Sequence, residues 1–328
     1  MKTFIIRRLF YMIPTLLAVS IVAFAIIQLP PGDYLTTLMA DWASQGGAVE
    51  AGTLDALRDR FGLDQPMYMQ YWKWITSIVT KGDFGVSFEH NKPVSEIIWG
   101  RLGYTFLISG LTLIFIWVMA IPIGIYSAVK QYSIGDYIAT FFGFIGLAIP
   151  SFLLALLLMY LTVVVFKYSV GGLFSIEYAD APWSVSKFLD FLAHVWMPIL
   201  VVGMAGLASL IRVLRANLLD ELHKPYVVTG RAKGLPEWRL ILKYPVRIAL
   251  NPLISTIGWV LPSLVSGEII VSVVLSLPTS GPILLRSLQA QDMYLAGSII
   301  LMVSTMTIIG TLVSDILLAL VDPRIRYQ

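Results

Sequence analysis

The sequence contains no cysteine and only three histidines, and these shortages exclude several kinds of chemical site. Without cysteine the chain cannot form disulfides, thiolate metal sites or a cysteine nucleophile. His90, His194 and His223 lie far apart, and none is spaced four residues from another, so the sequence gives little support to a histidine metal site. No G-x-x-x-x-G-K-[ST] run occurs, so the chain cannot bind ATP through a P-loop.

Charged residues are also scarce. They make up 13% of the chain, whereas 57% of the residues are hydrophobic, and a soluble domain usually carries about a quarter charged residues. The net charge of +3 is too small to indicate a nucleic-acid partner. Nine tryptophans and fifteen tyrosines suit the two interfaces of a lipid bilayer. The composition therefore predicts an integral membrane protein.

Six apolar stretches are long enough to cross a bilayer, at residues 9–29, 103–129, 137–166, 193–214, 250–275 and 295–320. Each is nearly free of charge, and backbone groups in lipid must bond within their own segment, so each is predicted to be a helix. Internal prolines such as Pro150 are tolerated in membrane helices. The first stretch follows basic residues, like a signal peptide, but it is longer than usual and no A-x-A site follows, so we expect it to be retained.

Lysine and arginine in the short loops predict the orientation. The loop at 215–249 is the most basic and is predicted to be cytoplasmic, together with both termini. The segment at 31–102 is then extracytoplasmic, with helical patterns at 54–61 and 67–79. It is either a small cap on the membrane domain or a surface that contacts substrate or a partner. The expected organisation is an N-terminal transmembrane helix (1–30), this extracytoplasmic segment (31–102), a five-helix core (103–320) with a cytoplasmic loop (216–249), and a cytoplasmic tail (321–328).

The cytoplasmic loop carries the signals of a short helix. Pro225 suits the first helical position, Gly234 suits a left-handed residue that ends the helix, and Pro236 prevents its continuation. Charge alone favours an ordinary basic loop. The pattern of Tyr, Thr, Ala, Gly and a following Pro instead favours a helix that docks into a socket on a soluble partner, such as an ATPase.

This loop is similar to the EAA loop of ABC importer permeases, and it most resembles the dipeptide/oligopeptide/nickel branch. That branch has R-x-x-R, matched by Arg212 and Arg215, followed by Y-V-x-T-A-R-A-K-G-L. The second motif is matched by Tyr226, Val227, Thr229, Arg231, Ala232, Lys233, Gly234 and Leu235. Gly230 replaces an alanine of the pattern, and Tyr244–Pro245 replace its usual His-Ala.

The resemblance covers nearly the whole chain. Further matches to the family pattern are Gly82–Ser87, Arg101 with Thr105, Gly124 through Ala128 to Asp136, Ile149–Phe152, Asp315, and the tail from Asp322 to Tyr327. Six matches in the right order on a six-helix chain form a strong signal.

The resemblance implies an all-α, type I ABC importer permease fold and a position in the plasma (inner) membrane of a prokaryote. It also implies a second homologous permease subunit, two cytoplasmic ATPase subunits that bind ATP and Mg, and an extracytoplasmic solute-binding protein. The chain would form half of the path for an oligopeptide-like solute, and would bind no cofactor and catalyse no reaction itself.

Glu268 is the main ionisable residue inside a predicted span, and such residues mark functional sites by default. The family usually has Glu where this chain has Ser272, one helical turn along the same face. Glu268 and Ser272 are therefore candidates for the translocation path. Glu268 could instead pair with a polar residue of another helix and stabilise the packing, and this structural role is slightly favoured. As a hypothesis, the displaced carboxylate marks a change of substrate, from peptide to oligosaccharide.

Two other classes of protein remain as alternatives. An ion-coupled secondary transporter should show paired broken helices and several intramembrane charges, whereas the chain offers mainly Glu268. An intramembrane enzyme should show H-E-x-x-H, G-x-S-x-G or a comparable motif, and the sequence contains none of these.

Overall fold

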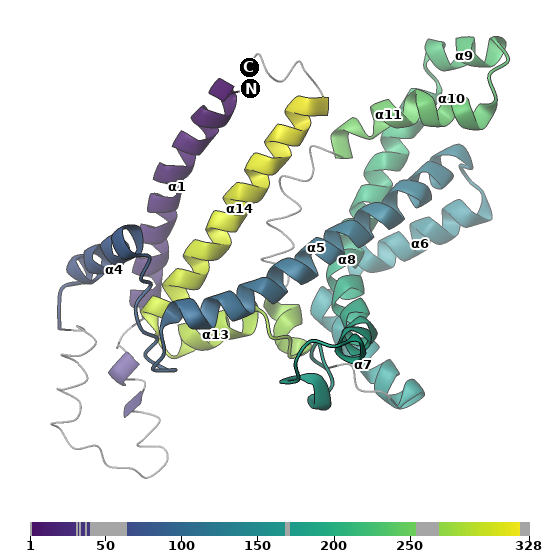
Figure 1. The fold of residues 1–328 in the computed structure, drawn as a ribbon. Helices are drawn as coiled ribbons and strands as arrows, with labels where there is room; N and C mark the ends of the chain where they lie inside the picture. Colours follow the sequence, from purple (N-terminus) through teal and green to yellow (C-terminus); the bar gives the residue numbers. More distant parts are fainter. Residues whose placement is uncertain are drawn as a thin grey trace. The chain divides into compact units, whose positions relative to one another are not determined.

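The computed structural model describes residues 2–30, 32, 34–36, 38–39, 64–167, 171–253 and 269–321. Within these ranges the regular structure is helical, apart from one isolated bridge between Val86 and Pro93 (Figure 1). The chain divides into two compact units. One unit contains residues 6–105 and 279–308, and the other contains residues 106–278 with both ends of the chain.

Within the described ranges, four helices are long and apolar enough to cross a membrane by themselves. These are α1 (Lys2–Gln28), α5 (Val94–Val129), α8 (Val185–Leu222) and α14 (Met293–Val321). A fifth span is formed if the bent pair α6 (Ile134–Ala148) and α7 (Ser151–Phe166) is counted as one. The stretch predicted at 250–275 falls mostly outside the described residues. The all-α membrane architecture is confirmed, and the predicted number of six spans stays a prediction.

The prediction of one continuous helix over 137–166 is wrong. α6 and α7 meet at an angle of 109°, and the break lies at Ile149 and Pro150, both of which have extended ψ angles of 122° and 136°. Proline has no N–H to donate to the preceding turn, and its ring pushes the preceding residue out of the helical region. Pro150 therefore ends one helix and starts the next.

The first unit is organised around α1, α4 (Met67–Lys81), α13 (Ser280–Gln289) and part of α14. The amphipathic pattern at 67–79 correctly predicts α4, which ends at Gly82 with a left-handed φ of 65°. The helix packs through Trp74, whose ring stacks on Phe24 of α1 with centroids 5.7 Å apart. Tyr71 adds an edge contact to the same ring. This packing favours the cap interpretation for α4, whereas the predicted helix at 54–61 lies outside the described residues.

Asp292 fixes the loop between α4 and α5 to the start of α14. One oxygen of its carboxylate accepts hydrogen bonds from the Ser87 hydroxyl at 2.6 Å and from the Glu89 N–H at 3.2 Å. The other oxygen accepts from the Leu295 N–H at 3.2 Å and so caps α14. The matched segment Gly82–Ser87 therefore contains a residue that ties the loop to a membrane helix.

The second unit is built on α5, α6 and α8, which approach closely where glycines face large side chains. A Cβ at Gly124 of α5 would lie 2.9 Å from Leu214 of α8, and one at Gly206 of α8 would lie 2.9 Å from Ile116 of α5. Small residues allow membrane helices to pack with close backbones. Further elements described in this unit include the 3₁₀ turn η1 (Ile176–Tyr178) and three short helices, α9 (Pro225–Ala232), α10 (Glu237–Lys243) and α11 (Pro245–Ala249).

Candidate coupling site

The short helix predicted in the basic loop is present as α9. Pro225 occupies its start, and Lys224 before it is extended, with a ψ of 147°. The helix ends at Ala232, two residues before the predicted end, and Gly234 follows with a left-handed φ of 74°. Apart from its chain neighbours, no described residue has an atom within 4 Å of where a Cβ of Gly234 would be, so its backbone angle, and not crowding, requires glycine here.

α9 and α10 form a compact pair of helices that lie side by side (Figure 1). Pro236 precedes α10 and starts it at Glu237. Leu240 of α10 is buried against Gly230 of α9, where a Cβ would overlap the Leu240 Cδ1 atom. The family pattern has alanine at this position, so Gly230 allows a closer packing of the two helices than alanine would.

An exposed ion pair closes the turn between the two helices. The Arg231 Nη2 atom lies 2.6 Å from Glu237 Oε1, and the hydrogen bonds from Arg231 lower the pKa of Glu237 below its usual value. The same contact raises the pKa of Arg231. Both side chains are about half exposed, so water screens the pair.

Tyr226 ties α9 back to the end of α8. Its hydroxyl donates to Glu221 Oε2 at 2.5 Å, and burial together with this carboxylate raises the pKa of Tyr226. The phenol therefore stays neutral at physiological pH and holds the start of α9.

The α9–α10 pair presents apolar and basic side chains together. The predicted site residues Val227 and Gly230 face inward, and the other seven are exposed. These seven are Tyr226, Thr229, Arg231, Ala232, Lys233, Gly234 and Leu235. Val228, Trp238 and Leu242 add exposed apolar surface of 57%, 62% and 53%. Exposed apolar side chains surrounded by polar ones are typical of a protein-interaction surface.

The candidate path residues are less well defined. Ser272 is fully buried, and its carbonyl accepts from the Leu277 N–H at 2.8 Å. Glu268 lies outside the described residues, so the structure does not bring the two candidates together. Among the residues described, no group of three or more His, Asp and Glu side chains is placed to hold a metal ion.

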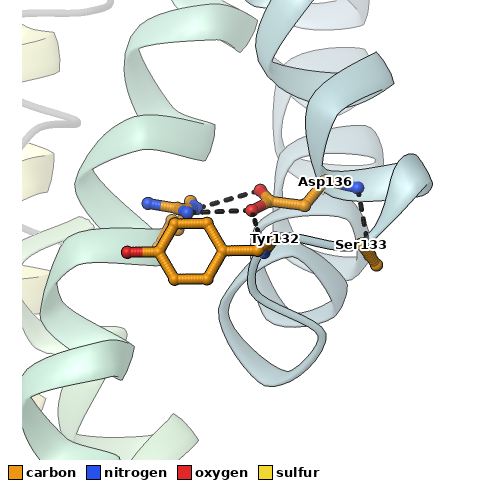
Figure 2. A network of polar contacts seen from close by, with 4 residues as sticks. Tyr132, Ser133 and Asp136 are labelled. Carbon is orange, nitrogen blue, oxygen red and sulfur yellow. Dashed lines mark hydrogen bonds and ion pairs between the residues drawn. The ribbon is translucent and has the colours of Figure 1, made fainter.

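An ion pair that the sequence did not reveal joins α6 to α8. Asp136 lies in the first turn of α6, and its two oxygens accept bonds of 3.0 and 2.9 Å from the Arg215 guanidinium (Figure 2). The Tyr132 N–H also donates to this carboxylate, and Ser133 caps the helix. The R-x-x-R motif identified Arg215 in the sequence but not its partner. The signal for Asp136 was its position in a matched motif next to a short loop.

Comparison with known proteins places these features in a family. Residues 120–327 match the binding-protein-dependent transport system inner membrane component. Residues 1–109 match the N-terminal part of the same kind of membrane component. The chain belongs to this family. The matches extend over both structural units, so the short helix α9 belongs to a permease and not to an unrelated membrane protein.

Relatives of the chain are named as peptide permeases. An oligopeptide transport system permease protein, AppB of Bacillus subtilis, is 36% identical over the full length of both chains. The dipeptide transport system permease protein DppB of Escherichia coli is 31% identical, again over both full chains. The glutathione transport system permease protein GsiC of Salmonella paratyphi A is also 31% identical over both full lengths.

Proposed function

We propose that this chain is a permease subunit of an ATP-driven importer and forms half of the membrane path for an oligopeptide-like solute. The observation that supports the proposal most strongly is the full-length similarity to permeases named for oligopeptides, dipeptides and glutathione. All three solutes are peptides, which favours a peptide over an oligosaccharide. The oligosaccharide alternative rests on the displaced Glu268 alone.

The proposed assembly contains a second homologous permease, two cytoplasmic ATPases that bind ATP and Mg, and an extracytoplasmic solute-binding protein. The α9–α10 pair would be the contact with an ATPase. Its exposed apolar residues, such as Trp238, would fill a socket, and its basic residues, such as Lys233, would set the orientation. Neither helix belongs to a candidate membrane span, as a contact with a soluble partner requires.

The proposed mechanism is alternating access. Closure of the ATP-bound partner subunits would move α9, and the Tyr226–Glu221 hydrogen bond would transmit that movement to α8. The Arg215–Asp136 pair joins α8 to α6, so these helices would move together. The solute would then pass between the two permeases, and reopening after hydrolysis would reset the path.

Co-purification tests the proposed assembly. The tagged chain, extracted gently from its native membrane, should bring with it a second permease and ATPase subunits, which mass spectrometry would identify. A chain that purifies alone, from a lysate in which ATPase subunits are detected, would favour an ion-coupled secondary transporter instead.

A further inference from the structure

An apolar groove of about 730 Å³ lies among α5, α6 and α8. Apart from Tyr126, every residue that lines it is apolar, including Phe115 and Pro122 of α5, Phe142 of α6 and Leu207 of α8. Phe142 is 56% exposed, so the groove opens to the surroundings of the unit. These helices belong to candidate membrane spans, so the groove lies at membrane depth.

The length of the groove is close to the thickness of one leaflet of a bilayer. The stretch of α5 from Phe115 to Tyr126 lines it and covers about 16 Å at ~1.5 Å per residue. The hydrocarbon core of a bilayer is roughly 30 Å thick, so one leaflet is about half of that. An acyl chain of a single lipid therefore matches the groove in length and polarity. A peptide would leave its amides without hydrogen-bond partners there.

Positive charge lies beside one end of this groove. A second cavity of about 190 Å³ shares four lining residues with the groove and adds Arg212 and Arg215. The charge of Arg215 is balanced by Asp136. Arg212 is exposed and, within the described part of the chain, makes no hydrogen bond or ion pair. Among the described residues the positive charge of Arg212 is therefore left without a counter-ion, in a cavity that adjoins the groove.

We propose that this groove and Arg212 together bind one anionic phospholipid. The acyl chain lies among α5, α6 and α8, and the phosphate meets the Arg212 guanidinium, which pairs well with phosphate oxygens. A helix of a neighbouring subunit would fill the apolar groove but would have to bring an acidic residue to Arg212, whereas an anionic lipid supplies both parts. This site does not depend on the proposed function, since it requires only a membrane-embedded chain.

Native mass spectrometry of the purified full-length chain tests the site. Phosphatidylglycerol and phosphatidylcholine with identical acyl chains are added in turn, and the retained lipid is counted. One charged contact near a membrane surface contributes enough for about a fivefold preference. The wild-type chain should therefore retain one phosphatidylglycerol about fivefold more readily than phosphatidylcholine.

Two variants test the two parts of the site separately. Arg212→Gln should abolish the preference for phosphatidylglycerol. Gly143→Leu should lower the retention of both lipids, because a Cβ at Gly143 meets only Ala208, at 3.8 Å, and a longer side chain then fills the groove. Arg247→Gln is the matched control, since Arg247 is also an exposed arginine, lies in α11 and lines neither cavity. It should behave as wild type.

Several results would overturn the site. Equal retention of the two lipids by wild type, or equal losses from Arg212→Gln and Arg247→Gln, would show only general attraction to a basic surface. Displacement of the whole lipid by excess glycerol phosphate would show that the groove holds no acyl chain. A photo-crosslinking residue in place of Phe142, in an otherwise wild-type chain in its native membrane, should capture lipid. Capture of a polypeptide would assign the groove to a subunit interface.

Discussion

The Asp136–Arg215 ion pair is asymmetric in its burial. The Asp136 side chain is 3% exposed, whereas the Arg215 side chain is 27% exposed and can reach water when its partner is removed. Removing one member of a buried pair leaves the other as an uncompensated charge, and the cost depends on how deeply that charge is buried. The two single substitutions should therefore differ.

Arg215→Ala should destabilise the chain by about 3 kcal/mol, and Asp136→Asn by about 1 kcal/mol, because only the first leaves a buried carboxylate without its cation. Thermal unfolding of the purified protein in detergent measures both. Arg231→Ala, which breaks an exposed pair, is the control and should cost less than about 1 kcal/mol. Equal losses from Arg215→Ala and Asp136→Asn would show that burial does not determine the cost.

Gly234 allows a separate test of backbone conformation. Its φ of 74° is strained for most residues, but no neighbour would contact a Cβ. Asparagine tolerates left-handed angles, whereas a β-branched residue does not. Gly234→Val should therefore uncouple ATP hydrolysis from uptake, while Gly234→Asn should retain most of the coupling. Both activities are measured in proteoliposomes that contain the whole transporter. A loss of coupling in Gly234→Asn equal to that in Gly234→Val would contradict this account of Gly234.

At the scale of elements, α9 could be predicted from the sequence almost completely, whereas α10 was not predicted. Pro225, Gly234 and Pro236 restrict the backbone by their own covalent structure, so no knowledge of distant contacts was needed. The bend at Pro150 could not be predicted in the same way. Membrane helices often continue past a proline, and the outcome depends on whether neighbouring helices satisfy the freed carbonyl.

The pairing of Asp136 with Arg215 could not be predicted from the sequence either. The two residues are far apart along the chain, and their contact depends on how α6 packs on α8. The role of Asp292 was missed for the same reason, since it acts on a loop about 200 residues earlier in the chain. Local patterns predict helices well, but long-range polar contacts require the packed structure.

The charge on α9 should matter for coupling more than for folding. Lys233 is exposed, and it follows the last residue of the helix. Lys233→Glu should therefore leave the unfolding temperature nearly unchanged, because exposed charges contribute little to stability. It should reduce peptide uptake while ATP hydrolysis continues. Lys224→Glu, also exposed but before the helix, is a comparison that should have a smaller effect. Normal coupled transport by Lys233→Glu would show that Lys233 has no role in docking.

The Arg231–Glu237 pair predicts a small dependence of the α9–α10 pair on pH. Arg231 lowers the pKa of Glu237 in the folded state. The ion pair therefore stabilises the folded state above the unfolded pKa of 4.5, and this contribution is lost as the pH falls through the lower, folded pKa. After correction for the intrinsic exchange rate, the hydrogen exchange of the α9 amides should therefore be faster at a pH below the folded pKa of Glu237 than at a pH above 4.5. Glu237→Gln should remove the difference, and an equal pH effect in this variant would assign it to another group.

At the scale of the whole molecule, the described chain combines long apolar helices with shorter helices outside the candidate spans, among them the pair α9 and α10. Its sequence contains no P-loop motif, and the proposed function assigns ATP hydrolysis to partner subunits. The full-length similarity to peptide permeases and the geometry of α9 therefore support the same account. In this proposed account a partner would hydrolyse ATP, α9 would receive the movement, and the Tyr226 and Arg215 contacts would pass it to the membrane helices.

The most direct test of this account is peptide uptake by the purified transporter that contains this chain, reconstituted into proteoliposomes with its solute-binding protein. We predict that a labelled oligopeptide accumulates only when ATP and Mg are supplied on the ATPase side, and that ionophores which collapse ion gradients leave the uptake unchanged. Uptake that proceeds without ATP and stops when the ion gradient is collapsed would contradict the account.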